Sequence, residues 1–174
     1  MHRTRNHPDQ TFARSGWGTH NHHLFVGVHN TAYCFLLART ESFTILAVYL
    51  PHGPTKIPSW ERIAVTAGSL TGERAIVIGD FNTGKHHVDE RGATFIAPEY
   101  LDRMASLGFV DAWRGQHPET RDYTWYSPQG NGFRLDHAYL SPRLAPALLC
   151  ARHVHEPRLA GVTDHAALVV DVEL

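Results

Sequence analysis

The sequence predicts an α/β fold, a sandwich of mixed β-sheets and helices, and three observations support this prediction. Apolar runs of strand length recur along the 174-residue chain, and two segments with helical spacing lie between them. Fourteen glycines and ten prolines are dispersed, which is typical of short elements separated by turns. Hydrophobic residues form 43% of the chain, which is enough for one domain with its own core.

The N-terminal third should contribute an arm and three strands. Residues 1–23 carry five histidines and no apolar period, so we expect an irregular arm before a single domain that spans residues 24–174. A short strand is expected at residues 24–28. Two further strands, at 32–37 and 43–50, flank a turn-forming polar sequence and should pair as a hairpin.

Helical spacing begins after a break rich in proline and glycine. A helix is expected to open at Pro58 and to extend to Leu70. A buried strand should follow at residues 75–80, and a loop that contains Gly, His and Asp runs to about residue 96. A second helix is expected at residues 97–107, where leucine and methionine share one face.

The last third reads mainly as strands. Residues 109–110 give a short extension, residues 123–126 alternate like a strand, and residues 133–140 form a strand after a turn. The chain closes with a strand at residues 166–172. Strands therefore dominate and the two helices lie between them, which favours mixed sheets.

The composition excludes several kinds of protein. A formal net charge of −1 provides no general basic field for nucleic acid. Arginine outnumbers lysine, which suits phosphate contacts, although genomic base composition explains the bias equally well. Cys34 and Cys150 are too few and too far apart for a disulfide framework or a zinc knuckle. No apolar run approaches the roughly 20 residues of a membrane span, and no signal segment is evident, so we expect a cytoplasmic protein without a membrane partner.

The most informative segment is the end of the strand at residues 75–80. Four apolar residues run into Gly79, and Asp80 and Asn82 follow two positions apart. Side chains at such positions of an extended segment point the same way, so both should face one pocket at the carboxyl end of the strand. A carboxylate and an amide aimed together suit a hydrated divalent cation and the phosphate that it binds.

Six short motifs occur in an order that is characteristic of a known family. They are Tyr49-Leu50-Pro51-His52-Gly53, Gly79-Asp80-Phe81-Asn82, Gly108-Phe109-Val110-Asp111-Ala112-Trp113, Thr124-Trp125-Tyr126, Arg134-Leu135-Asp136 and Thr163-Asp164-His165. Over roughly residues 43–174 this series resembles the endonuclease/exonuclease/phosphatase superfamily, and most closely the branch of exonuclease III and the apurinic/apyrimidinic endonucleases. The resemblance implies a four-layer α/β sandwich, two mixed sheets flanked by helices.

The resemblance also implies a role for each polar residue near Asp80. Asp80 would orient or deprotonate the attacking water, and it would share the binding of Mg²⁺ or Mn²⁺ with Asp164. Asn82 would donate a hydrogen bond to a phosphate oxygen of the substrate. Tyr49 would reach the phosphate or the leaving group.

The remaining roles concern the opposite wall of the predicted pocket. His165 would contact the scissile phosphate, and Asp136 would hold its imidazole in place. A His–Asp pair favours the imidazolium form, which is the form that is useful against a phosphate. Arg134 would support this wall and contribute to substrate binding.

Structural alternatives remain open for these residues. Asp80 could cap a turn, Asp136 could pair with Arg134, Asp164 and His165 could belong to a surface turn, and Tyr49 could pack in the core. Three tryptophans are expected to be core aromatics rather than base-stacking platforms: Trp60, Trp113 and Trp125. The pair His86-His87 follows the Gly-Asp-Phe-Asn loop closely enough to contact a metal or phosphate, and His20-Asn21-His22-His23 reads as surface histidines.

The N-terminal part departs from the family pattern. Relatives carry an Asn-x-Asn motif and a Gln-Glu motif on their first strands, and neither is found here. Glu41 and Glu61 lie in a turn and on a helix, so neither replaces the metal-binding glutamate. We expect a sheet that lacks the first strands of the family fold, with an exposed edge that could support a homodimer.

The sequence favours a divalent-metal-dependent phosphodiester hydrolase, most simply a DNA endonuclease or exonuclease. RNA or a small phosphoester is the alternative substrate within the superfamily. A hypothesis of another class is a non-catalytic truncated scaffold that binds a partner or nucleic acid, because a metal-binding carboxylate is missing.

Overall fold

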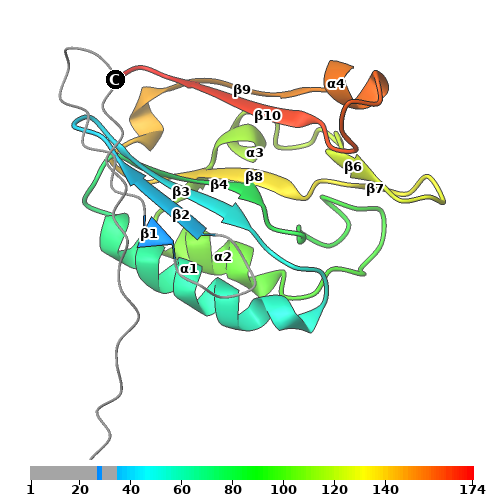
Figure 1. Ribbon diagram of the computed structural model, residues 1–174, viewed down its shortest axis with the longest axis horizontal. Helices are drawn as coiled ribbons and strands as arrows, with labels where there is room; N and C mark the ends of the chain where they lie inside the picture. Colours follow the sequence, from blue (N-terminus) through cyan, green and yellow to red (C-terminus); the bar gives the residue numbers. More distant parts are fainter. Residues whose placement is uncertain (1–26, 29–34) are drawn as a thin grey trace, which may run out of the picture.

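A mixed sheet of six strands lies at the centre of the computed structural model, which describes residues 27–28 and 35–174 (Figure 1). The strands are β1 (Gly27–Val28), β2 (Phe35–Arg39), β3 (Thr44–Tyr49), β4 (Ala75–Asp80), β5 (Val110–Asp111) and β8 (Asp136–Leu140). Their order in the sheet is β1-β2-β3-β4-β8-β5. The pair β3 and β4 is parallel, and the other neighbouring pairs are antiparallel.

Smaller elements surround the central sheet. Two antiparallel pairs are formed by β6 (Trp125–Tyr126) with β7 (Gly132–Phe133) and by β9 (Leu148–Val154) with β10 (Ala167–Val172). The α-helices are α1 (Ile57–Leu70), α2 (Glu99–Ser106), α3 (Ala112–Gln116) and α4 (Glu156–Leu159), and two 3₁₀ turns lie at Pro54–Lys56 and Ala145–Ala147. Every helix of the described segments is too short or too polar to cross a lipid bilayer.

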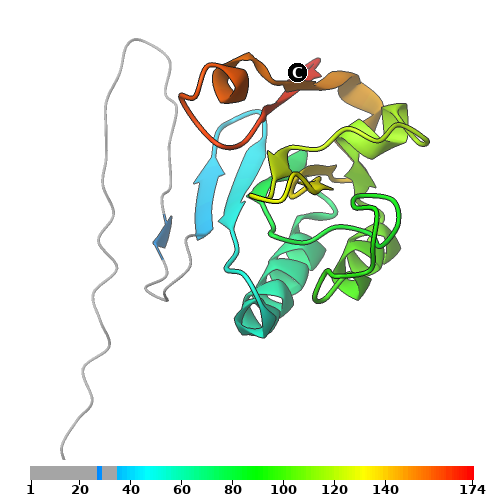
Figure 2. The ribbon, with the colours of Figure 1, turned by 90° about the vertical axis from the view of Figure 1, so that its right-hand side faces the viewer.

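The central sheet separates two apolar cores. Helices α1 and α2 cover one face, and the β9–β10 pair with α3 covers the other, as the two views show (Figures 1 and 2). The first core contains fully buried side chains from α1, α2 and β4, among them Trp60, Met104 and Val77. The second contains Leu140 and Trp113. The mixed α/β fold is therefore as predicted, whereas a helical layer outside β9–β10 stays a prediction.

Helix α1 forms where the apolar period predicted it, because Trp60, Ile63, Ala67 and Leu70 occupy one stripe and are all buried. It is the crossover that the parallel β3–β4 pair requires. The predicted β2–β3 hairpin is also present, with Phe35 opposite Val48.

Other predicted elements differ in extent. The second helix starts at Glu99 rather than at residue 97, because Ala97 has a left-handed backbone with φ 65°. The strand predicted at 133–140 is interrupted between β7 and β8, where the Arg134 amide donates to the Asp89 carbonyl and the Phe81 amide donates to the Leu135 carbonyl. Strand β9 and helices α3 and α4 were not predicted. Arg152 and His153 interrupt the apolar run of β9, so the strand has no clear alternation.

Glycine at position 79 is dictated by the approach of a neighbouring strand. Gly79 has φ 146°, and a Cβ atom there would lie 1.9 Å from the carbonyl oxygen of Val48. No other residue fits without moving β3 away from β4. The glycine of the Gly-Asp-Phe-Asn motif therefore allows β3 and β4 to pack closely, and this brings their last residues, Tyr49 and Asp80, close together.

The N-terminal predictions fall mostly outside the described residues. Of the strand expected at 24–28, the structure describes β1, which pairs with β2 at the end of the central sheet. The arm at residues 1–23 and the residues 29–34 are not described. The homodimer expected at this edge and the domain limits stay predictions.

Candidate active site

Three of the predicted site residues form a row across neighbouring strands. Tyr49 at the end of β3 is in register with Asp80 at the end of β4, and Asp80 is in register with Asp136 at the start of β8. Adjacent strands lie about 4.8 Å apart, and residues in register project to the same face of a sheet. The topology thus gathers two carboxylates and a phenol at one edge of the sheet.

These three residues line a pocket of about 380 Å³ together with Asp164 and His165. The other residues in its wall are His52, Trp125, Leu135 and Thr163. Tyr49 is 55% exposed, so it is not the core residue of the structural alternative. Five predicted site residues that are far apart in the sequence are therefore brought to one cavity.

Asp164 and His165 are held in this cavity by hydrogen bonds. His165 Nδ1 lies 2.8 Å from Asp136 Oδ2, and the Trp125 indole N–H donates to Asp164 Oδ2 at 3.2 Å. The alternative in which Asp136 pairs with Arg134 does not occur, because the carboxylate of Asp136 bonds the imidazole of His165. This is the His–Asp arrangement that the resemblance implied.

Thr124 joins three segments of the pocket wall. Its fully buried hydroxyl accepts hydrogen bonds from the amides of Leu135 at 3.0 Å and Asp136 at 3.3 Å. Its carbonyl accepts a hydrogen bond from the Ala166 amide at 2.8 Å. Thr124 thereby fixes both Asp136 and the segment that carries Asp164 and His165. The Thr-Trp-Tyr motif marked this position in the sequence, but its polar role was not predicted.

Asp80 and Asn82 do not face one pocket as the extended spacing predicted. Asn82 has a left-handed backbone with φ 48°, so the alternation of an extended strand ends at Asp80. Asn82 instead lines an adjoining cavity of about 220 Å³, which shares His52, Trp125 and Leu135 with the first. The two residues therefore lie in neighbouring compartments of one depression.

The amide of Asn82 is committed to the protein on its nitrogen side. Its Nδ2 donates to the carbonyl of Leu50 at 2.6 Å and to Asp80 Oδ2 at 3.1 Å, and its backbone N–H donates to Asp80 Oδ1 at 2.8 Å. Its Oδ1 is buried without a hydrogen-bond partner. The predicted donation from Asn82 to a phosphate is thus not available in this geometry, whereas an unpartnered acceptor is.

The surroundings raise the pKa of two groups in the site, the carboxyl of Asp80 and the imidazole of His165. Burial, and then the charge of Asp136, raise the pKa of Asp80 to about 6, against the opposing effects of the Asn82 amide and His165. The hydrogen bond from Asp136 raises the pKa of His165. The pocket therefore makes Asp80 a stronger base than a free carboxylate and favours the imidazolium form of His165 more than solvent does.

A buried lysine supports this arrangement from behind. Lys56 is 1% exposed and donates from Nζ to the backbone carbonyl of Asn82. Burial lowers its pKa to about 8, in opposition to the attraction of Asp80. No sequence motif indicated this role, because Lys56 stands at the start of a helix and outside the six family motifs. Its charge nevertheless lies behind the loop that carries both Asp80 and Asn82.

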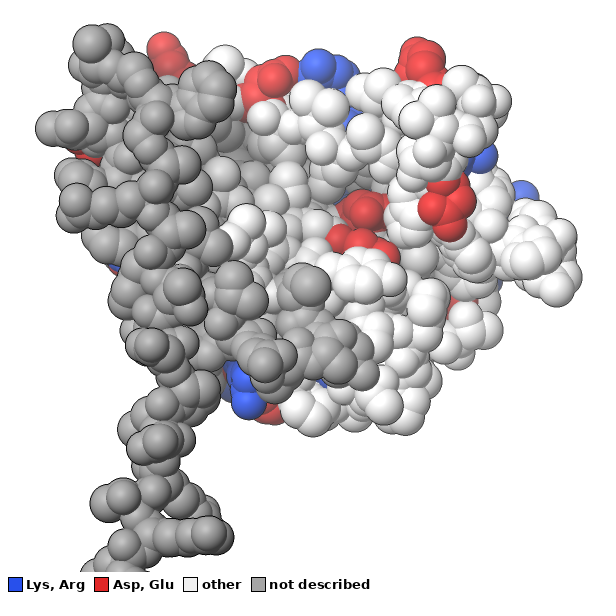
Figure 3. Space-filling view, viewed as in Figure 1, with Lys and Arg blue, Asp and Glu red and all other residues white. Residues whose placement is uncertain are grey.

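The pocket wall is otherwise acidic. Asp80, Asp136 and Asp164 contribute three carboxylates, and none of the described residues in the wall is a lysine or arginine. On the face drawn in Figure 3, acidic side chains lie in a central hollow and the basic side chains lie at the margins. Carboxylate oxygens suit a divalent cation, which typically takes one or two carboxylates and keeps several waters.

Arg134 lies outside the pocket, in contrast to its predicted contact with substrate. Its side chain is 2% exposed, and it forms ion pairs with Asp89 at 2.7 Å and Asp111 at 2.8 Å. His137, also buried, lies 3.3 Å from the same Asp111 carboxylate and 2.8 Å from the Thr83 carbonyl. Because its charge is already paired, Arg134 supports the wall from within the protein and does not reach a bound phosphate.

The predictions for the tryptophans and for His86-His87 agree with the structure only in part. Trp60 and Trp113 are buried in the core, as expected. Trp125 instead lines both cavities, so the expectation of a core residue was wrong for this tryptophan. His86 bonds the carbonyl of Phe95 at 3.0 Å, and neither His86 nor His87 lines the pocket.

Comparisons with known proteins agree with the resemblance. A model of the Endonuclease/Exonuclease/phosphatase family matches residues 4–165. Recombination repair protein 1 of Drosophila melanogaster is 24% identical over 176 residues, which include 85% of this chain and 26% of that protein. The chain thus spans about a quarter of the length of this curated relative.

Solved structures show the same fold. A 3′ phosphatase, NExo, from Neisseria, bound to a product DNA hairpin, superposes with a TM-score of 0.75 at 21% identity, covering 87% of this chain and 70% of that chain. An AP endonuclease from Archaeoglobus fulgidus superposes with a TM-score of 0.72 at 24% identity, covering 80% of this chain and 65% of that chain. Structural likeness at these low sequence identities shows that the fold is shared.

Proposed function

Because the chain belongs to the endonuclease/exonuclease/phosphatase family, we propose that it is a divalent-metal-dependent phosphodiester hydrolase that acts on DNA. The observation that carries this proposal is the gathering of Asp80, Asp136, Asp164 and His165 around one pocket. Three carboxylates in one wall repel a phosphate unless a cation lies between them. The carboxylates of this wall therefore support both a bound metal ion and phosphodiester hydrolysis.

The proposed ion is Mg²⁺ or Mn²⁺, held by Asp164 and Asp80, with the unpartnered Oδ1 of Asn82 as a further oxygen nearby. When bound, such an ion supplies positive charge against the non-bridging oxygens of the phosphate. The described residues in the wall include no glutamate. Carboxylates from the described residues are nevertheless enough for an ion that keeps several waters.

Asp80 is proposed to accept a proton from the attacking water. With a pKa of about 6 the carboxylate is largely ionised at pH 7.5, and it is still basic enough to remove a proton. The amide groups of Asn82 hold both carboxylate oxygens, so the side chain cannot rotate away from the pocket. Lys56 adds a positive charge behind this loop and favours the ionised carboxylate.

His165 is proposed to stabilise the charge that develops on the phosphate. Asp136 orients the imidazole through Nδ1 and leaves Nε2–H to donate to a phosphate oxygen. Tyr49 lies in the same wall with an exposed side chain, and we assign it a hydrogen bond to the phosphate or the leaving oxygen.

DNA is the proposed substrate because proteins of similar fold include a phosphatase bound to a DNA hairpin and an AP endonuclease. Trp125 lines the pocket and offers an aromatic surface to a sugar or base. RNA and small phosphoesters remain alternatives, since a net charge of −1 gives the chain no broad cationic surface.

The test is hydrolysis of abasic-site duplex, single-stranded DNA, RNA and a generic phosphodiester with Mg²⁺ or Mn²⁺. We expect Asp80→Asn to reduce kcat by about 10²- to 10⁴-fold, the usual contribution of a general base, and EDTA to abolish turnover. Asp102→Asn is the matched control, because Asp102 lies on α2 and forms an exposed ion pair with Lys85. Activity that resists EDTA, or that is unchanged in Asp80→Asn, contradicts the proposal.

Calorimetry distinguishes the enzyme from a non-catalytic scaffold. The enzyme should bind Mn²⁺ with an affinity that falls in Asp164→Asn and not in Asp102→Asn. A scaffold would show no binding that depends on Asp164.

A further inference from the structure

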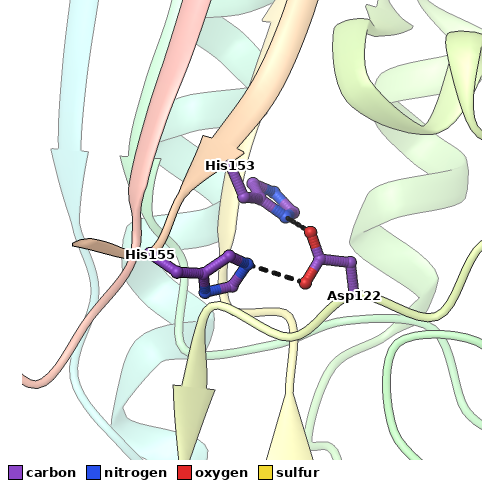
Figure 4. Close-up of side chains that lie close together, drawn as sticks. All are labelled: Asp122, His153 and His155. Carbon is purple, nitrogen blue, oxygen red and sulfur yellow. Dashed lines mark hydrogen bonds and ion pairs between the residues drawn. The ribbon is translucent and has the colours of Figure 1, made fainter. Parts of the chain in front are cut away.

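A second cluster of ionisable groups lies outside the pocket. Asp122 precedes β6, His153 lies near the end of β9, and His155 caps α4 (Figure 4). His153 Nδ1 is 3.0 Å from Asp122 Oδ2, and His155 Nε2 is 2.9 Å from Asp122 Oδ1. None of the three lines the pocket around Asp80. Sequence patterns did not indicate the cluster, because Asp122 lies about thirty residues from the histidines.

His153 presents a neutral nitrogen to the carboxylate. Its side chain is wholly buried, its ring stacks on Trp113 with centroids 4.5 Å apart, and its Nε2 has no hydrogen-bond partner. Burial lowers its pKa, against the attraction of Asp122. A neutral imidazole fixed in orientation by packing is the form that ligates a metal.

We propose that Asp122, His153 and His155 form a binding site for a divalent transition-metal ion of the Zn²⁺ type. A carboxylate oxygen and two imidazole nitrogens lie within 4.8 Å of one another, which is the arrangement of three protein ligands around one ion. Two nitrogens and one oxygen suit Zn²⁺ or Co²⁺, whereas Mg²⁺ prefers oxygen ligands alone. Water would fill the remaining position.

Binding of the ion requires that each of the two imidazoles present a ring nitrogen without a hydrogen. Without metal, one ring nitrogen of His153 and one of His155 each share a hydrogen with a different oxygen of the Asp122 side chain. When the ion binds, each imidazole changes tautomer, so that it presents a free nitrogen to the ion and carries its one proton on the other ring nitrogen. For His155 that nitrogen is Nδ1, which lies 3.5 Å from Arg158 Nη2. Arg158 must therefore turn away, and its guanidinium already lies over the Tyr126 ring, 4.8 Å from the centroid.

Occupation of this site would tie together two segments that shape the pocket. Asp122 lies two residues before Thr124, which holds Asp136 and Ala166 through hydrogen bonds. His155 begins the stretch that leads through α4 to Asp164 and His165. A bound ion would thus join both ends of the wall from outside, in addition to any ion in the pocket itself.

The first test is calorimetric titration of the full chain with ZnCl₂. Wild type should bind one more equivalent of Zn²⁺ than Asp122→Asn or His155→Gln, because each variant lacks one of the three protein ligands. His87→Asn is the matched control, since His87 is exposed, lies outside the cluster and has a left-handed backbone that Asn adopts. Zinc bound by the histidines of residues 1–23 is common to all four proteins. Equal stoichiometry in wild type and Asp122→Asn would overturn the proposal.

A second test uses spectroscopy and thermal unfolding. Co²⁺ should give wild type and His87→Asn a visible absorption band that Asp122→Asn lacks, and a large excess of Mg²⁺ should not remove it. Zinc at about 100 times its Kd should raise the wild-type Tm by roughly 5–10 °C more than that of Asp122→Asn. Circular dichroism without metal checks that the variants fold. These readouts need no substrate, so they stand or fall separately from phosphodiester hydrolysis.

Discussion

At the scale of the residue, the candidate site depends on a break in backbone geometry after Asp80. Gly79 lets β3 and β4 approach, and Asn82 adopts a left-handed conformation in which its amide holds both oxygens of Asp80. The sequence marked Asp80 and Asn82 as functional, but the rule for extended segments placed them wrongly relative to each other. A positive φ at a residue other than glycine is not visible in a sequence, although Asn is among the residues that tolerate it.

The pairing of Asp136 with His165 predicts a pH profile. Activity should rise as Asp80 loses its proton near its pKa of about 6, and fall at alkaline pH as His165 loses its proton. In Asp136→Asn the cause that raises the pKa of His165 is removed, so the alkaline limb should move to lower pH. The same change removes a charge that raises the pKa of Asp80, so the acid limb should move the same way.

The measurement is the pH dependence of kcat for both proteins between pH 5 and about pH 9, with kcat lower in the variant by about ten-fold or more. Asp102→Asn should keep the wild-type profile. An alkaline limb that does not move in Asp136→Asn would show that His165 is not the group that titrates.

At the scale of the element, short connections position the site more than the long strands do. Thr124 accepts hydrogen bonds from the amides at the start of β8 and from the segment before β10, so it joins parts of the chain that have no other common neighbour in sequence. The buried hydroxyl cannot be replaced by water, because the residue is fully inaccessible.

Thr124→Val tests this role. Valine keeps the shape but leaves the amides of Leu135 and Asp136 without an acceptor, which should cost about 1–3 kcal/mol for each buried amide left unpaired. Urea unfolding measures the loss of stability, and kcat should fall because Asp136 and His165 lose their fixed separation. Thr124→Ser retains the hydroxyl and should restore most of both quantities. If valine and serine behave alike, the hydroxyl is not the link.

Elements with a strong apolar period were predictable, and elements defined by tertiary contacts were not. Helix α1 and strand β4 followed their periods because a single stripe or run of residues is buried. Strand β9 was missed because Arg152 and His153 interrupt it. Arg152 forms an ion pair with Asp171 and His153 forms a hydrogen bond with Asp122, both from other segments. Helix α3 owes its start to Asp111, which accepts from the Arg114 amide and also bonds Arg134.

At the scale of the whole molecule, a buried charge network joins segments that are far apart in the sequence. Arg134 pairs with Asp89 and Asp111, and His137 contacts the same Asp111. Burial by itself would raise the pKa of Asp89, but the charge and hydrogen bonds of Arg134 bring it down to about 2. Against the same effect of burial, Arg134 and His137 hold the pKa of Asp111 well below its usual range.

This network predicts acid sensitivity. Because the folded pKa of Asp89 is lower than the unfolded value of 3.8, its contribution is present above about pH 4 and is lost as the pH falls towards 2. The contribution of Asp89 is of the order of 2–3 kcal/mol. Urea unfolding at pH 7, 4 and 2.5 measures it.

Asp89→Asn should be less stable than wild type at pH 7 by about 2–4 kcal/mol, because Arg134 keeps an incomplete partner, and its stability should depend less on pH in the acid range. The exposed Asp102 is the control, and Asp102→Asn should keep the wild-type slope. A slope unchanged in Asp89→Asn would place the acid sensitivity elsewhere.

The family and most of the pocket could be predicted from the sequence, because the order of the motifs can be read directly from it. Contacts between residues that are distant in the sequence cannot be read in this way. Tyr49, Asp80, Asp136, Asp164 and His165 were named from their motifs, and the structure brings all five to one cavity. Lys56 behind the site, and the cluster at Asp122, depend on contacts between residues that are tens of positions apart. No local pattern encodes such contacts, so only the folded chain reveals them.

The sheet order has an evolutionary consequence. The pocket takes its side chains from strand ends and loops, and exposed turns such as residues 128–131 between β6 and β7 connect these elements. Loop-closure entropy grows slowly, by roughly 0.6 kcal/mol for each doubling of a connection. Insertions and deletions in these connections are therefore inexpensive, and they change the rim that a substrate meets while the strand ends stay in place. Such a scaffold can acquire new substrates by altering loops, without rebuilding the chemistry at its centre.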